Sequence, residues 1–203
     1  MGHVIHAGKT LHDKLSQKSL SLSRIIVTDF VQECKRIAGI DHPNIVKVIG
    51  TAMFPSYIFP MIVMELMDNN LHHYLEMRHQ IPLIIKQSIL EDVARGILYL
   101  HTQSPDPIVH RDLTAYNVLL SSSLVAKITD IGNFIFAELL SSQTSAAAGR
   151  PGGIQCPQDM VVYMPPEYCD ESKKSSPSLD IFFFGHLVLF TATQVKYNNT
   201  ILF

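Results

Sequence analysis

The chain has 203 residues, of which 47% are hydrophobic and 17% are charged, a composition that is ordinary for a globular protein and argues against intrinsic disorder. A formal net charge of −2 gives no reason to expect nucleic acid or an anionic membrane surface as a partner. The three cysteines follow no Cys-x-x-Cys spacing, no signal-peptide pattern is present, and the longest apolar run, residues 181–193, is too short to span a bilayer. We therefore expect a cytoplasmic protein with reduced thiols and no membrane insertion by this segment.

The first third of the chain predicts mainly strands. Three stretches have the alternating or continuous apolar residues that are typical of short strands: residues 4–9, 45–51 and 57–66. Between the first two, apolar residues at helical spacing predict a helix that begins near Thr28 or Asp29 and ends near Gly39. These elements predict a small, β-rich unit.

The remainder predicts helices and one hairpin. Residues 88–101 are strongly amphipathic, and one apolar stripe is expected to face the core: Ile89, Val93, Ile97 and Leu100. A hairpin is predicted across residues 121–123, between the short apolar runs 118–120 and 125–128. Residues 178–193 are apolar nearly all round, which predicts a helix inside a domain.

The most informative stretch lies between these two helices. It contains His110-Arg111-Asp112-Leu113, then Asn117, and then Asp130-Ile131-Gly132. Phosphoryl transfer needs a carboxylate that receives the proton of the acceptor hydroxyl and hard oxygen ligands that hold Mg²⁺ on the phosphates. Asp112, Asn117 and Asp130 supply groups of these kinds. The alternative is that His-Arg-Asp-Leu is a chance tetrapeptide in a solvated turn, but the added asparagine and second aspartate favour Mg-nucleotide chemistry.

These motifs resemble the catalytic loop and the metal-binding Asp-Phe-Gly of eukaryotic protein kinases, with Ile131 in place of the phenylalanine. The resemblance implies ATP as phosphate donor, Mg²⁺ as cofactor and a protein as substrate. It makes Asp112 the catalytic base, flanked by His110 and Arg111, and it makes Asn117 and Asp130 the magnesium ligands.

Two residues near the N-terminus resemble the lysine–glutamate pair of the same family. Ala7-Gly8-Lys9 is similar to the end of the Val-Ala-Ile-Lys strand, which makes Lys9 the phosphate-contacting lysine. Glu33 is similar to the glutamate of the following helix that pairs with this lysine, and its position before His-Pro-Asn-Ile-Val supports that register. The alternatives are a surface lysine on an edge strand and a solvated helix glutamate.

The residues around 60–71 resemble the last small-lobe strand and the hinge of a kinase. By this match Met64 is the gatekeeper, the backbone from Glu65 to Met67 faces adenine, and Leu71 opens the next helix. Leu119 would support the adenine ring from below. A buried strand followed by a turn, and a generic core leucine, would have a similar sequence.

Three further matches concern structure more than chemistry. Gly132 ends the Asp-Ile-Gly motif, Glu167 belongs to a Met-Pro-Pro-Glu that resembles the end of the activation segment, and Asp180 is expected to accept hydrogen bonds from catalytic-loop amides. For Asp180, the alternative is a simple N-cap of its own helix. The serine-rich stretch before Glu167 offers candidate phosphorylation sites, with Arg111 as the natural partner of a phosphate: Ser141, Ser142, Thr144 and Ser145.

As a whole, the resemblance implies an α+β, protein-kinase-like two-lobe fold. Residues 1–66 would form a partial, β-rich N-lobe and residues 67–203 a partial, mainly helical C-lobe, together one kinase domain. We expect this fold to be truncated at both ends, without the glycine-rich loop and without the helices that cover the last apolar helix. Each large apolar side chain contributes about 1.5–3 kcal/mol when buried, so incomplete cover predicts a soft or partner-dependent chain.

The first functional hypothesis is an ATP-dependent protein kinase that phosphorylates Ser/Thr in preference to Tyr, in the tyrosine-kinase-like group. The second is a kinase-like pseudoenzyme or regulatory interaction module without turnover, which works through a regulatory protein partner. The retained Asp112, Asn117 and Asp130 favour the first hypothesis, and the missing glycine-rich loop favours the second. A membrane-anchored parent protein is compatible with both.

Overall fold

The computed structural model describes residues 6–10, 35, 37–52, 61–78, 80–131 and 176–194, with the backbone alone for the first of these ranges. Several predicted site residues lie outside the described ranges: Glu33, Gly132, Glu167 and the four candidate phosphorylation sites. The fold is α+β, with small antiparallel sheets and helices, as the resemblance to protein kinases implied.

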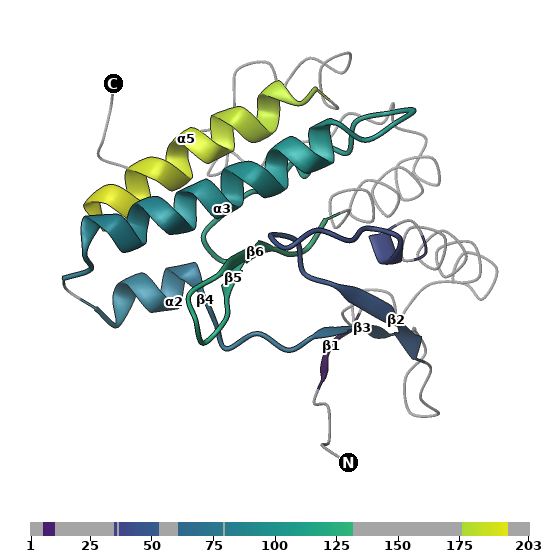
Figure 1. Ribbon diagram of the computed structural model, residues 1–203, viewed down its shortest axis with the longest axis horizontal. Helices are drawn as coiled ribbons and strands as arrows, with labels where there is room; N and C mark the ends of the chain where they lie inside the picture. Colours follow the sequence, from purple (N-terminus) through teal and green to yellow (C-terminus); the bar gives the residue numbers. More distant parts are fainter. Residues whose placement is uncertain are drawn as a thin grey trace, which may run out of the picture.

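A three-stranded antiparallel sheet forms the smaller part of the described structure. It contains β1 (His6–Thr10), β2 (Val48–Ala52) and β3 (Met61–Glu65), in the order β1-β3-β2 (Figure 1). The second strand was predicted to begin at Ile45, which is wrong. Ile45 instead forms a parallel bridge with Ile128, and the amide of Val46 donates to the Ile128 carbonyl at 2.9 Å. This segment therefore joins the small sheet to the second sheet.

The second sheet is also antiparallel and has three short strands. They are β4 (Asn69–Asn70), β5 (Val118–Leu120) and β6 (Ala126–Ile128), in sequence order across the sheet. The predicted hairpin across residues 121–123 is confirmed, since β5 pairs with β6 in antiparallel register. Its tight turn places Leu124 at φ 62°.

Three helices are described in the larger part. They are α2 (Leu71–Glu76), α3 (Leu83–His101) and α5 (Ser178–Thr193). Helix α2 begins at Leu71 as predicted, because the side chain of Asn70 accepts a hydrogen bond from the His73 amide at 2.8 Å and caps the first turn.

Helix α3 is longer than predicted. It begins at Leu83, directly after Pro82, and not at Ser88. Leu83 and Ile84 are exposed, so the first turn lacks the amphipathic pattern that marks the rest of the helix. The predicted stripe is confirmed, since each of its residues is at most 3% exposed: Ile89, Val93, Ile97 and Leu100.

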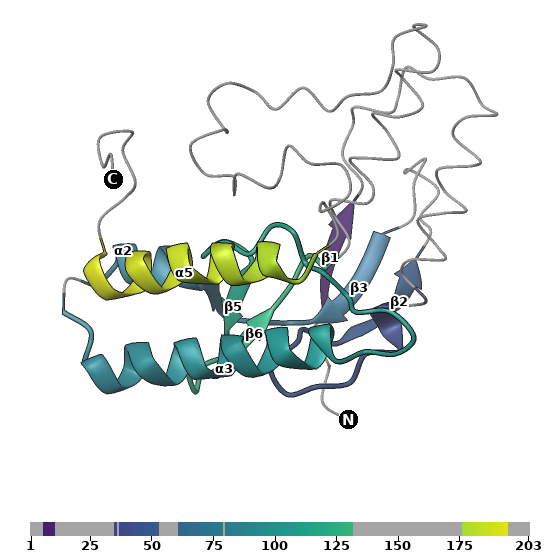
Figure 2. The same cartoon turned by 90° about the horizontal axis from the view of Figure 1, so that it is seen from above.

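Helices α3 and α5 lie side by side and run in opposite directions, as both views show (Figures 1 and 2). Helix α3 also packs on the second sheet and approaches it closely at Gly96. A Cβ atom there would stand 2.8 Å from both the Asn44 carbonyl oxygen and Cδ1 of Ile128. Glycine is therefore required for the packing of α3 on β6.

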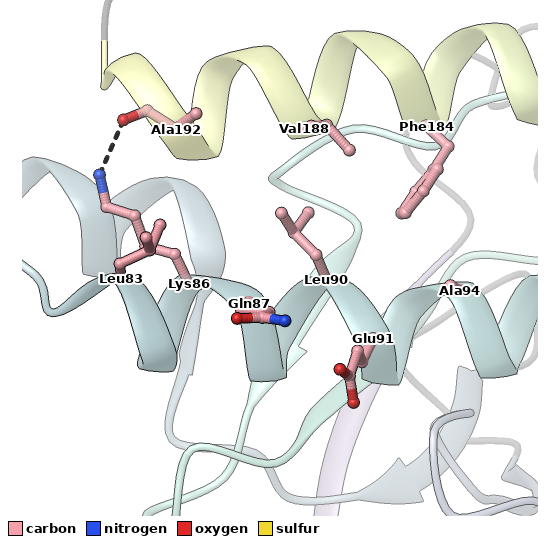
Figure 3. A pocket seen from close by; sticks show the side chains of 9 residues that line it. All are labelled: Leu83, Lys86, Gln87, Leu90, Glu91, Ala94, Phe184, Val188 and Ala192. Carbon is pink, nitrogen blue, oxygen red and sulfur yellow. Dashed lines mark hydrogen bonds between the residues drawn. The ribbon is translucent and has the colours of Figure 1, made fainter.

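A groove of about 430 Å³ separates part of α3 from α5 (Figure 3). Leu90 of α3 points across it toward Val188 and Phe184 of α5. At one end, Nζ of Lys86 donates to the Ala192 carbonyl at 2.9 Å, so a cation occupies the C-terminal end of α5, where carbonyl groups lack helical partners.

Helix α5 was predicted to lie inside the domain, and the described part of the structure corrects this. Leu179, Phe183 and Leu187 are buried, but Ile181 and Val188 are exposed by 57% and 36%. The helix thus has one buried face and one exposed face. Among these residues, no helix combines the length and apolar character needed to cross a membrane.

Candidate active site

The catalytic loop predicted from the sequence brings Asp112 and Asn117 into contact. Nδ2 of Asn117 donates to the backbone carbonyl of Asp112 at 2.7 Å and to its carboxylate Oδ2 at 3.0 Å. Asn117 is buried, whereas Asp112 is exposed. Because the amide nitrogen of Asn117 is committed to Asp112, the orientation of the amide is fixed, and Oδ1 is the atom that can bind a cation.

His110 joins this loop to the segment that carries Asp130. Its Nδ1 accepts a hydrogen bond from the Asp112 amide at 3.2 Å, and its Nε2 bonds the Thr129 carbonyl at 2.7 Å. This arrangement uses the tautomer with the proton on Nε2. The Thr129 amide also donates to the Asn117 carbonyl at 2.9 Å. Because His110 is 1% exposed, these bonds form in the interior and hold the two predicted motifs together.

Asp180 lies beneath the loop, fully buried at 0% exposure. Its Oδ2 accepts from the His110 amide and its Oδ1 from the Arg111 amide, both at 2.8 Å. The alternative of a simple N-cap is excluded because Pro177 is the N-cap of α5 and makes no side-chain capping bond. Arg111 has φ 67°, a left-handed conformation that is unfavourable for a non-glycine residue and is held here by the bond to Asp180.

His101, which the sequence analysis did not single out, also contacts Asp180. Its Nε2 lies 2.8 Å from Oδ2 of Asp180. A histidine at the end of an amphipathic helix carries no periodicity or spacing signal, so only its place next to the catalytic loop could have indicated it.

The Asp-Ile-Gly motif is described up to Ile131. Asp130 is half-buried and has φ 65°, so its backbone is also left-handed. Ile131 is 6% exposed and lines a small cavity of about 30 Å³ together with Ile37 and Met64. An aliphatic side chain therefore packs into the interior at this position.

The predicted hinge residues lie at the junction of the two sheets. Met64 is buried, and Met67 and Leu119 are half-buried. The amide of Glu65 donates to the Lys47 carbonyl at 3.0 Å, so it is not offered to a ligand. The Glu65 carboxylate is bound by Nζ of Lys127 at 2.8 and 2.9 Å and by the Lys47 amide at 2.7 Å. This side chain therefore ties the small sheet to β6.

Comparison with known families identifies the family to which the chain belongs. The family model of protein tyrosine and serine/threonine kinases matches residues 8–200. The chain belongs to the protein kinase family.

Several plant receptor-like kinases are similar to this kinase domain. The G-type lectin S-receptor-like serine/threonine-protein kinase RKS1 of Arabidopsis thaliana is 33% identical over 174 residues, which are 83% of this chain and 19% of that relative. The kinase SD1-1 of the same type and organism is 37% identical over 169 residues, 80% of this chain and 19% of that relative. Cysteine-rich receptor-like protein kinase 24, also from Arabidopsis thaliana, is 33% identical over 165 residues, 79% of this chain and 24% of that relative. The chain thus spans about a fifth to a quarter of these relatives.

The structure describes too little of Lys9 and Glu33 to place the predicted lysine–glutamate pair. Lys9 lies on β1 opposite Ile62, but the structure describes only its backbone. Glu33 lies outside the described ranges. The pairing of Lys9 with Glu33 stays a prediction, as do the roles of Gly132 and Glu167 and the division into lobes at residues 66 and 67.

The described part of the kinase domain holds no group of three or more His, Cys, Asp or Glu side chains arranged to bind a metal. The two predicted ligands, Asn117 and Asp130, are one amide and one carboxylate. Such a sparse set fits Mg²⁺, which in nucleotide sites keeps several waters and takes its other ligands from phosphates.

Proposed function

We propose that this protein kinase domain transfers the γ-phosphate of ATP to a hydroxyl group of a protein substrate. The observation that carries the proposal is the bonding of Asp112 and Asn117 to each other, together with the bonds through His110 to Thr129, the residue before Asp130. The candidate base and the two candidate magnesium ligands therefore lie on two short segments that are hydrogen-bonded to each other.

In this proposal Asp112 is the catalytic base. Asp112 is exposed, so a substrate hydroxyl can approach it, and the bond from Asn117 to Oδ2 restricts the rotation of its carboxylate. The hydroxyl oxygen attacks the γ-phosphorus, its proton passes to Asp112, and the bond to the bridging oxygen breaks so that ADP leaves.

Asn117 and Asp130 are the residues that would hold Mg²⁺, which supplies charge neutralisation on the phosphates. The fit rests on the donor chemistry: the amide nitrogen of Asn117 is taken by Asp112, which turns its oxygen away from that residue. For the adenine ring we propose the hinge around Met64 to Met67 and the half-buried Leu119, and for the phosphates Lys9 with Glu33.

We favour serine and threonine as acceptors, because two of the relatives above are named serine/threonine-protein kinases. The same names contain "receptor-like", so we propose that the domain functions on the cytoplasmic side of a membrane-anchored parent.

The test is transfer of label from [γ-³²P]ATP with Mg²⁺ to casein, followed by phosphoamino-acid analysis. We expect labelled phosphoserine and phosphothreonine, and no label once EDTA removes Mg²⁺. Labelled phosphotyrosine alone would refute the preference for Ser/Thr. Binding of Mg-ATP without any transfer would instead support the pseudoenzyme.

A further inference from the structure

We propose that the groove between α3 and α5 binds a medium-chain fatty acid, with its carboxylate on Lys86 and its alkyl chain along the groove. A ligand of this class combines one negative charge with an apolar chain. The site is independent of phosphoryl transfer, because the groove shares no residue with the candidate active site. Two features of the groove point to such a ligand: its apolar walls and the positive charge at one end.

The walls of the groove have the size and character of a site for an alkyl chain. Apolar side chains of both helices form them: Leu83, Leu90, Ala94, Phe184, Val188 and Ala192. Leu90, Val188 and Phe184 face one another across the groove (Figure 3). The volume of about 430 Å³ is that of a small-molecule site, for which about 300–1,000 Å³ is usual. From Lys86 to Ala94 the groove follows α3 for about 12 Å, at 1.5 Å per residue, which suits a chain of about ten carbons.

Lys86 is a buried cation that no carboxylate of the described structure neutralises. The residue is 9% exposed, and its Nζ donates to the Ala192 carbonyl at 2.9 Å and to Oε1 of Gln194 at 3.3 Å. Neither acceptor is ionised, although the carbonyl at the end of α5 carries part of the helix dipole. An ammonium group has three N–H donors, so a third is available to a ligand. Because a buried charge is costly unless an opposite charge pairs with it, a carboxylate is the ligand group that this position favours.

The other residues around Lys86 leave this charge in place. Glu91 also lines the groove, but its Oε2 accepts from Nη2 of Arg95 at 3.2 Å, and it points away from α5 in Figure 3. Gln194 is held by its Nε2, which donates to the Leu75 carbonyl at 2.9 Å, so its Oε1 stays directed at Lys86. A fixed cation at the end of an apolar groove is complementary in charge to an amphiphilic carboxylate.

Calorimetric titration of the full chain without nucleotide tests the proposal with two ligands of equal chain length. Decanoate has the carboxylate and decan-1-ol lacks it, and both are used below the concentration at which they aggregate. Lys86→Met removes the ammonium group and keeps an apolar stem. Val188→Trp fills the middle of the groove. Its control is Val125→Trp, because Val125 and Val188 are each 36% exposed and Val125 lies outside the groove, directly before β6.

We expect one decanoate to bind per chain, and decan-1-ol to bind about tenfold more weakly. Lys86→Met should weaken the binding of decanoate about tenfold and leave that of decan-1-ol nearly unchanged, which also shows that the groove of the variant is intact. Val188→Trp should weaken the binding of both ligands at least about tenfold, because the alkyl chain loses its apolar contacts. Val125→Trp should alter neither.

Three results would overturn the proposal. The first is the absence of saturable decanoate binding, and the second is binding that Lys86→Met or Val188→Trp leaves unchanged. The third is self-association of the wild type in sedimentation that Val188→Trp abolishes, without binding of decanoate, which would assign the groove to a second copy of the chain. Phosphate transfer is measured separately, so failure of the proposed function leaves this test intact.

Discussion

Two glycines on different helices allow a sharp test of how α3 packs. Gly96 is buried, and an added Cβ would lie 2.8 Å from a backbone oxygen, that of Asn44, as well as from the end of the Ile128 side chain. Gly185 of α5 is exposed, and an added Cβ there meets no heavy atom within 4 Å. Replacement by alanine changes the same number of atoms in a helix interior in both cases.

Gly185→Ala should stabilise the fold by about 1 kcal/mol, the difference in helix propensity between the two residues. Gly96→Ala gains the same free energy of helix propensity, but its Cβ must displace α3 from the Asn44 carbonyl. That carbonyl itself accepts a hydrogen bond from the Ile128 amide at 2.9 Å. Overpacking of this kind costs about 1–3 kcal/mol. Because the propensity term cancels, we expect Gly96→Ala to be less stable than Gly185→Ala by about 1–3 kcal/mol.

Urea unfolding followed by circular dichroism measures this difference as a shift of midpoint at constant slope. Equal midpoints for the two variants would refute the close approach of α3 to β6. A change of slope in one variant would show that the two-state comparison does not hold for it.

Two further predictions concern ion pairing and pH. Lys127→Met should lower the free energy of unfolding by about 1 kcal/mol, because it leaves the half-buried Glu65 carboxylate without its cation. Arg95→Met should cost less than about 0.5 kcal/mol, because the Arg95 side chain is 62% exposed where it pairs with Glu91 and Asp92 of its own helix. Equal urea midpoints for these variants would contradict the role of Glu65. Burial lowers the pKa of His42 below the ordinary value of 6.5. The unfolded chain therefore takes up the proton first, and stability should fall as pH drops below about 6.5. His42→Asn, which keeps an acceptor for the Asn44 amide, should reduce that fall, and an unchanged pH profile would refute it.

The elements that could be predicted from the sequence are those whose signal is local. The stripe of α3 and the hairpin follow from periodicity and from turn residues, and both are present. The start of α2 at Leu71 came from the family resemblance, and it is also present. The order of oxygen donors from Asp112 to Asp130 could be recognised because the loop and the hairpin that carry them are continuous in sequence, and the chemistry that it indicates stays a proposal.

The features that were missed depend on contacts between distant segments. Ile45 pairs with Ile128, so a strand that looked continuous begins three residues later, at Val48. The bonds of Glu65 to Lys127 and of His101 to Asp180 join residues 62 and 79 positions apart. No single-sequence pattern records such pairs. The start of α3 was missed for the opposite reason, since its first turn is exposed and has no apolar face to recognise.

The central claim is that Asp112 acts as the base of a phosphoryl-transfer site. The most direct test compares the rate of phosphate transfer from Mg-ATP to casein in the wild type, in Asp112→Asn, and in Asp106→Asn, the same change at an exposed aspartate in the turn after α3. General-base catalysis contributes about 10²–10⁴-fold, so we expect Asp112→Asn to lose at least about 100-fold in rate while binding Mg-ATP as the wild type does, and Asp106→Asn to be unaffected. Transfer at the wild-type rate by Asp112→Asn would contradict the account.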